Sequence, residues 1–288
     1  MKVFLILAVL SLPALSKASN RDIFDVMYLP SAGTTFGISD AAYLNRKQTG
    51  KSGNMDTDIS ALGINQTVGH SFSDRFSVSA SLNYIDATID PDVGSDVEVR
   101  GISDPTFLSR FRLMEEGDLR LDLIGGALLS LGDSEIKSSG NTDNRQGGHG
   151  LLVGAQVGQK KENFQWSILG QLTHNLERTY DFPFGNADID SNNDLFIRAD
   201  ILNKLGEKSF LRSFAAVDFR GSLESDDTTP QTINASSTDY ELGTEYQYLC
   251  SKDFLARVGV DYGDNNSNSG DLKSDRPWTF RVGATYQF

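Results

Sequence analysis

Apolar and polar residues alternate along almost the whole chain, and no other feature of the sequence constrains the fold as much. Between Trp278 and Phe288 every second residue is apolar, and the residues between them are polar or glycine. The stretches FSVSASLNY (76–84) and DLRLDLIGGALLSL (118–131) show the same period of two. This is the period of an extended strand with one apolar face and one polar face. A single such strand fits the edge of a water-soluble sandwich, whereas many in succession fit a membrane barrel.

The alternation predicts twelve strands, most of them close to the ~9–11 residues with which a tilted strand crosses a membrane. The predicted strands lie near residues 33–45, 58–69, 76–84, 104–113, 118–131, 150–158, 164–174, 194–202, 210–220, 239–249, 254–263 and 277–288. The first of these is less regular because Asp40 interrupts whichever face is chosen.

The gaps between the predicted strands alternate strictly between short and long. The short gaps lie around 71–74, 114–117, 160–163, 203–207 and 250–253. The long gaps, rich in Asp, Asn, Ser and Gly, lie around 46–57, 87–97, 132–147, 175–192, 222–237 and 264–275. A membrane barrel with both chain ends on the periplasmic side has short turns there and long extracellular loops. We therefore expect an all-β fold, a 12-stranded antiparallel transmembrane β-barrel, over residues 33–288.

Aromatic residues recur on the apolar faces at a fixed spacing of eight residues. Eight residues of strand span roughly 26 Å, which a tilt of ~40° shortens to about 20 Å. That length is close to the ~25 Å apolar band between the two aromatic girdles of a membrane barrel. The predicted girdle pairs are Phe76 with Tyr84, Tyr240 with Tyr248, Phe254 with Tyr262, and Trp278 with Tyr286.

The first residues have the features of a secretory signal peptide. Lys2 precedes an apolar run from Val3 to Leu15, and Ser16-Lys17-Ala18 supplies small residues for cleavage after Ala18. Removing residues 1–18 leaves 24 basic residues against 39 acidic ones, a net charge of −15. Without a basic patch to neutralise phosphates, nucleic acid is not an expected partner. Residues 19–32 then either lead into the barrel or plug its periplasmic mouth.

If the apolar faces point outward, a set of charged residues points inward. The predicted lumen-lining residues are Arg110, Arg112, Arg120, Asp122, Arg198, Arg212, Asp218, Arg220, Arg257 and Arg281. Further inward acids are Asp104, Asp118, Asp200, Asp239, Glu241, Glu245 and Asp261. Barrels of eight strands are filled by side chains and barrels of sixteen leave an aqueous channel, so twelve strands predict a narrow, charged passage. The alternative is that these charges pair across a closed lumen and only stabilise it.

The three histidines and the acidic loops are the candidate residues for an enzyme or a metal site. Lipid-hydrolysing barrels carry a serine two residues after a histidine, but Phe72, Leu151 and Leu176 follow His70, His149 and His174 at that offset. No pair at this spacing therefore supplies an activated serine. The loop DNNSNSGD (264–271) places its glycine one position late for a calcium-binding EF-hand loop. We expect no enzymatic activity, no metal site and no cofactor.

Two stretches resemble a known outer-membrane family. YLPSAGTTFGISDAAYLN (28–45) is similar to that family's segment of a proline, a Gly-Thr step and a first apolar strand. GISDPTFLSRFRL (101–113) is similar to its G-x-G-D-x-T strand, with Ser103 in place of the second glycine. Both are typical of the family named for the meta-cleavage pathway of phenol degradation. The resemblance implies a twelve-stranded barrel that passes small, often hydrophobic or aromatic, molecules, and it carries over no catalytic residue.

The sequence thus predicts a porin-like channel for passive uptake of small molecules in the outer membrane of a Gram-negative bacterium. The rival hypotheses are a closed structural or adhesive barrel with acidic outer loops, and a lipid-modifying enzyme. Expected partners are outer-membrane lipid, lipopolysaccharide, the small-molecule cargo and the barrel assembly machinery. The C-terminal Phe288 resembles the element that this machinery reads.

Overall fold

The structure is a computed structural model that describes residues 22–50, 56–92, 96–132, 134–135, 148–182, 185–225, 231–234, 236–267 and 272–288. The predicted signal peptide, residues 1–18, lies outside this part. Within these ranges no helix is long and apolar enough to cross a membrane.

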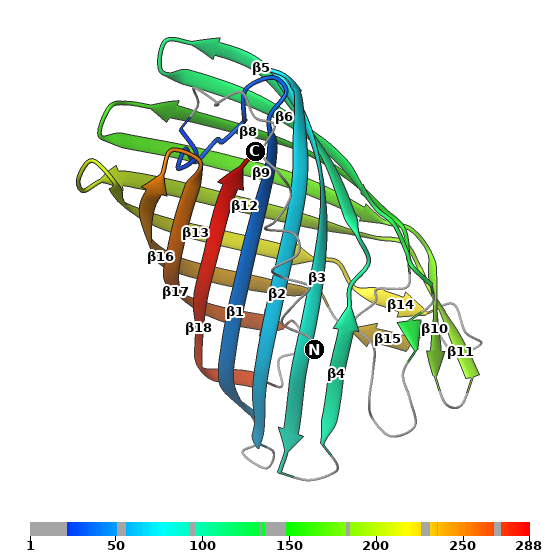
Figure 1. Cartoon of the computed structure of the whole chain (residues 1–288). Coiled ribbons are helices and arrows are strands. Elements are labelled where there is room, and N and C mark those ends of the chain that lie inside the picture. Colours follow the sequence, from blue (N-terminus) through cyan, green and yellow to red (C-terminus); the bar gives the residue numbers. More distant parts are fainter. Residues whose placement is uncertain are drawn as a thin grey trace, which may run out of the picture.

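The described chain forms a closed antiparallel barrel of twelve strand positions (Figure 1), as the alternation predicted. Two consecutive strands, β4 and β5, together occupy one position because both pair with β3. The barrel strands are β1 (Thr35–Gly50), β2 (Asp56–Ser73), β3 (Phe76–Pro91), β4 (Val97–Ile102), β5 (Thr106–Glu116), β6 (Leu119–Leu128), β8 (Gly150–Lys160), β9 (Phe164–Asn175), β12 (Asn192–Lys204), β13 (Ser209–Arg220), β16 (Ser237–Ser251), β17 (Phe254–Ser267) and β18 (Leu272–Gln287).

The first and last strands close the barrel. β1 pairs with β18 from Phe36 opposite Gln287 onward, and β1 pairs with β2 on its other side. The backbone N–H of Phe288 donates to the carbonyl oxygen of Thr35 over 2.8 Å. This pairing leaves neither β1 nor β18 with an unpaired edge, which a membrane could not hydrate.

The outward faces of the strands are apolar and exposed. Leu82, Val153, Leu242, Phe280 and Val282 are between 44 % and 62 % exposed. An exposed apolar surface that encircles a closed barrel is stable only against lipid. Inward and outward side chains alternate along each strand, and for this reason the sequence shows a period of two.

The two ends of the barrel differ, as the gap lengths predicted. Tight turns join β2 to β3, β5 to β6, β8 to β9, β12 to β13 and β16 to β17. At the other end the strands run farther than predicted. β1 continues to Gly50 and β3 to Pro91, since polar residues such as Arg46 and Gln48 extend the ladder beyond the apolar band.

Three of the long gaps hold a second, small sheet instead of consisting only of loops. Its strands are β7 (Ser134–Glu135), β10 (Arg178–Phe182), β11 (Gly185–Ile189), β14 (Leu223–Ser225) and β15 (Gln231–Asn234). This sheet lies beside one part of the barrel rim, at the lower right of Figure 1. The sequence reasoning did not predict it, because segments this short carry no readable alternation.

Much of the apolar core lies at the tight-turn end. The residues before β1 pack there, and they lie at the same end as the tight turns in Figure 1. Ile23, Met27 and Leu29 are almost fully buried, together with Phe210 of β13 and Leu255 of β17. We call residues 22–33 the N-terminal segment.

Candidate functional site

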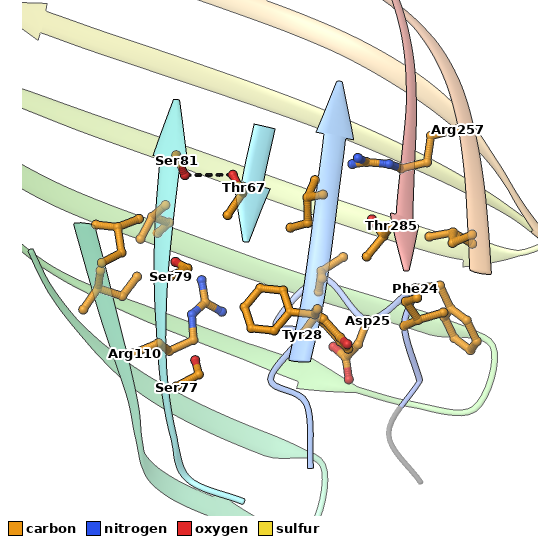
Figure 2. A pocket seen from close by; sticks show the side chains of 18 of the residues that line it. Phe24, Asp25, Tyr28, Thr67, Ser77, Ser79, Ser81, Arg110, Arg257 and Thr285 are labelled. Carbon is orange, nitrogen blue, oxygen red and sulfur yellow. Dashed lines mark hydrogen bonds between the residues drawn. The ribbon is translucent and has the colours of Figure 1, made fainter. Parts of the chain in front are cut away.

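Three cavities inside the barrel follow one another and share lining residues. The first, of about 350 Å³, borders the N-terminal segment and is called the segment-side cavity (Figure 2). The second, of about 150 Å³, lies next to it and is enclosed mainly by charged side chains. The third, of about 720 Å³, lies toward the long loops and is called the loop-side cavity. Arg212 and Arg257 line the first two, and Asp40 and Arg281 line the last two.

The charged residues around the middle cavity form a cluster that we call the charge belt. Its members are Asp40, Arg198, Arg212, Glu245, Arg257, Asp261 and Arg281. They come from β1, β12, β13, β16, β17 and β18, so that most of them lie on one side of the barrel. The smallest of the three cavities is therefore also the most highly charged.

Ion pairs hold the charge belt in place. Arg257 of β17 contacts Asp40 of β1 over 2.7 Å, across the intervening strand β18. Asp200 accepts from both Arg198 at 3.0 Å and Arg212 at 2.8 Å. Arg281 pairs with Asp261 and with Glu241. Asp40, which disturbed the sequence pattern of the first strand, is thus an inward partner of an arginine.

A separate ion-paired cluster lies near the tight turns. Arg112 of β5 and Asp122 of β6 are 1 % and 0 % exposed, and the arginine Nε lies 2.8 Å from the aspartate Oδ1. A second guanidinium nitrogen of Arg112 donates to Asp122 Oδ2 at 3.2 Å and to the Met27 carbonyl at 2.7 Å. Such a pair is stable only when its remaining hydrogen-bonding groups are also satisfied. Arg112 therefore links the barrel wall to the N-terminal segment.

Charged residues of the neighbouring strands β6 and β8 also hold the N-terminal segment. Asp25 pairs with Arg120, and Lys160 lies 3.3 Å from Asp25 and 2.6 Å from Asp22. Burial raises the pKa of Asp25, but the nearby charges of Arg120 and Lys160 outweigh it and lower the pKa below the ordinary carboxyl value. Asp25 is therefore a carboxylate at neutral pH.

Apolar packing and one glycine complete this contact. The ring of Phe24 stacks on Phe210 with centroids 3.9 Å apart. A Cβ atom on Gly158 would come within 2.6 Å of the Met27 sulfur and 2.4 Å of the Trp166 carbonyl oxygen. A side chain at position 158 would thus displace the segment, and glycine allows its close approach.

The predicted lumen-lining residues at the loop end are less enclosed. Arg220 is 58 % exposed and contacts Asp218 at 3.0 Å and Asp239 at 2.9 Å. Asp118, predicted to face inward, lies exposed in the tight turn before β6. The other predicted arginines belong to the charge belt or to the cluster near the tight turns.

The predicted girdle residues occupy several environments. Tyr240, Tyr248, Tyr262 and Trp278 are exposed on the outer surface, and Tyr262 and Trp278 contact each other edge to face. Phe76, Tyr84 and Phe254 are half-buried. Tyr286 is only 6 % exposed, because its ring lies over Gly37 of the neighbouring strand.

The histidines make local contacts. The backbone N–H of Ser130 donates to His149 Nδ1 at 3.1 Å, whereas the Ser130 hydroxyl donates to the Gly132 carbonyl. His174 Nδ1 lies 2.9 Å from Asn193 Oδ1, and His70 Nδ1 lies 3.0 Å from Thr35 Oγ1. Among the described residues, no group of three or more His, Cys, Asp or Glu side chains is placed to hold a metal ion.

Sequence reasoning missed a polar wall opposite most of the charge belt. Ser77, Ser79 and Ser81 of β3 follow one another on the inner face, beside Thr67 of β2. The hydroxyls of Thr67 and Ser81 lie 2.7 Å apart. The alternation in FSVSASLNY placed these serines on the inner face, but their small polar side chains gave no separate signal.

The fold is shared with known outer-membrane proteins. A crystal structure of an outer membrane channel from Pseudomonas putida F1 matches 93 % of this chain and 100 % of its own length, with a TM-score of 0.68 and 10 % sequence identity. The β domain of the Bordetella autotransporter BrkA matches 90 % of this chain and 100 % of its own, with a TM-score of 0.48 and 15 % identity. The NanC porin matches 85 % of this chain and 98 % of its own, with a TM-score of 0.48 and 9 % identity.

No family model matches the chain, and no curated protein sequence matches it. The first of these structural similarities therefore establishes the barrel architecture.

Proposed function

We propose that the protein is an outer-membrane channel for the passive uptake of small molecules. The observation that carries this proposal is the row of three cavities inside a closed barrel, each sharing lining residues with the next. Side chains fill the interior of an eight-stranded barrel, whereas a sixteen-stranded barrel leaves an aqueous channel. A barrel of twelve strands has an intermediate diameter. The row of cavities is what such an intermediate diameter predicts.

Two features make the proposed passage narrow. The charge belt reduces it to a cavity of about 150 Å³, and the N-terminal segment occupies the tight-turn mouth. We propose that this segment is a plug that must move out of the tight-turn mouth before solutes pass. The ion-paired walls hold long charged side chains in place, so we expect a low conductance.

The proposed setting is the outer membrane of a Gram-negative bacterium, with the tight turns on the periplasmic side. The exposed apolar band would contact lipid, and the polar loop end would contact lipopolysaccharide. Phe288 closes against Thr35 at the tight-turn end, where we expect the assembly machinery to recognise it.

A closed structural barrel is the second candidate, and a specific observation favours it. In the described part of the chain the interior arginines contact carboxylates, and the N-terminal segment is bound by both ion pairs and apolar packing. If these contacts never open, no solute crosses.

Planar-bilayer recording of the purified protein distinguishes the two candidates. We expect discrete conductance steps in potassium chloride, smaller than those of a sixteen-stranded porin in the same membrane. A variant lacking residues 22–28 should conduct more than the full chain, because the tight-turn mouth is cleared. The absence of conductance steps in both proteins would overturn the channel proposal and leave the closed barrel.

A further inference from the structure

The segment-side cavity has an unequal charge lining. Three guanidinium groups line it, those of Arg110, Arg212 and Arg257, against one carboxylate, that of Asp25. Asp25 is already held by Arg120 and Lys160. The carboxylates that contact Arg257, Asp40 and Glu245, line the next cavity instead. The interior is thus nearly balanced in charge as a whole, but this cavity has an excess of positive charge.

Arg110 is the least neutralised of these arginines. Within the described residues its partner is Asp122 at 3.5 Å, and both oxygens of that carboxylate are closer to Arg112, at 2.8 Å and 3.2 Å. Two guanidinium groups therefore share one carboxylate. The Arg110 side chain is 27 % exposed, and Figure 2 shows it pointing into the cavity.

Two hydroxyl groups of β3 lie beside Arg110. Ser77 lies directly opposite Arg110 in the β3–β5 pairing, and Ser79 is the next inward residue. In the part of the chain that the structure describes, neither serine hydroxyl has a hydrogen-bond partner. A planar guanidinium with adjacent hydroxyl donors is suited to bind a carboxylate.

The rest of the cavity combines polar residues, such as Gln171, Gln247 and Thr285, with an apolar part. Ile38, Leu108 and Leu169 line it from the barrel, and Phe24 and Val26 line it from the N-terminal segment. A volume of about 350 Å³ lies within the range of small-molecule sites, which combine apolar walls with a few convergent polar groups. A ligand for this cavity would place one charged group at Arg110 and a hydrocarbon body against these side chains.

We infer that the segment-side cavity binds small organic anions that carry a carboxylate on a hydrocarbon body, and that such anions are the preferred cargo. The role of these anions as cargo rests on the proposed channel function. The binding site itself is inferred from the cavity alone. Arg110 is the specificity-determining residue, and Ser77 and Ser79 are the additional donors.

The test measures binding of three probes of matched size to the folded protein at neutral pH. Isothermal titration calorimetry in a non-ionic detergent would compare hexanoate, 1-hexanol and hexylammonium, each corrected by titration into protein-free micelles. We expect hexanoate to bind more tightly than the other two. Arg110→Gln should weaken hexanoate binding about tenfold or more, as expected when a charged hydrogen-bond donor is lost. Ser79→Ala should weaken it less, and Arg220→Gln, at the loop end, should leave it unchanged.

The outcomes separate this inference from the channel proposal. Equal binding of the three probes, or hexanoate binding that neither Arg110→Gln nor Ser79→Ala weakens, overturns the anion site even if the protein conducts. Selective hexanoate binding by a protein that never conducts supports the site while the channel proposal fails. Heat-modifiable migration on a cold gel establishes that each variant is folded, and Ser79→Ala tests the site independently if Arg110→Gln does not fold.

Discussion

Inside this barrel, arginines and carboxylates share partners instead of forming separate pairs. Asp122 forms ion pairs with both Arg110 and Arg112, and Asp200 forms ion pairs with both Arg198 and Arg212. Removing one member of a buried pair leaves an uncompensated charge away from water, which costs more than the intact pair contributes. The effect of substituting one charged residue therefore depends on which other charges its ion-pair partner still contacts.

The buried pair of Arg112 and Asp122 gives the clearest prediction at this scale. Arg112→Met should lower the free energy of unfolding by about 3–5 kcal/mol, because it leaves Asp122 buried without its main partner. The double variant Arg112→Met/Asp122→Leu should regain at least half of that loss. Urea unfolding in lipid vesicles, followed by the fluorescence of Trp166 and Trp278, measures both.

The control is a pair on the barrel surface. Arg100 and Asp86 also lie 2.9 Å apart, but their side chains are 60 % and 37 % exposed. Arg100→Met should change the stability little, since water already solvates both charges. A double variant as unstable as Arg112→Met alone would contradict this account of the buried pair.

At this scale the alternation assigned residues to an inward face but did not predict which residues they contact. The alternation placed Arg110, Arg112 and Arg120 on one face. The partner of each depends on strand register and on the N-terminal segment, which pairs Asp25 with a residue 95 positions away in the sequence. A period of two carries no information about such contacts.

Among the structural elements, the N-terminal segment determines what the tight-turn end can do. It makes ion pairs with β6 and β8, hydrogen bonds with β5 and β9, and a ring contact with β13. The sequence left open whether these residues lead in or plug the mouth, because they show no period of either strand or helix. Their buried positions became visible only with the barrel around them.

The lowered pKa of Asp25 makes this contact sensitive to acid. A carboxyl group whose folded pKa lies below its ordinary value of about 3.9 stabilises the folded contact above that value and loses the contribution as pH falls through the folded pKa. We therefore expect the segment to loosen, and the bilayer conductance to rise, as the pH falls from 7 to about 3.

Asp25→Asn tests the assignment to this residue. Removal of the carboxylate should give a higher conductance already at pH 7 and a smaller change on acidification. A wild-type conductance that is the same at both pH values, or an Asp25→Asn variant that matches the wild type at both, would count against this role.

The number and order of the strands could be predicted from the sequence, but their lengths could not. Their number and order followed from the alternation and from the gap lengths. The alternation arises because one face of each strand contacts lipid and the other contacts water or packed side chains. Their lengths did not follow. Beyond the apolar band both faces of β1 are polar, and in β3 the apolar residues change from even to odd positions after Tyr84, at Ile85, Ala87 and Ile89. The break between β4 and β5 at Ser103–Pro105 was also hidden, as the sequence predicts one strand from 104.

The whole molecule combines a closed wall with a graded interior. The wall is set by the pairing of β1 with β18, and the interior passes from the segment-side cavity through the charge belt to the loop-side cavity. The small sheet of β7, β10, β11, β14 and β15 lies beyond the barrel rim. This sheet joins three gaps that are far apart in the sequence, which explains why no local pattern predicted it.

The central claim is that solutes cross through the interior of the barrel, and thiol modification during current recording tests it most directly. In a Cys250→Ser background, Ser79→Cys places a thiol in the segment-side cavity, and the adjacent Val78→Cys places one on the lipid-facing surface. A small sulfonate-bearing thiosulfonate reagent is then added to each protein while it conducts in a planar bilayer. The account predicts a stepwise, lasting fall in current for Ser79→Cys and none for Val78→Cys, because an added group obstructs only the side of the wall that faces the passage. An unchanged current in Ser79→Cys, with modification of the thiol verified by mass spectrometry, would contradict it.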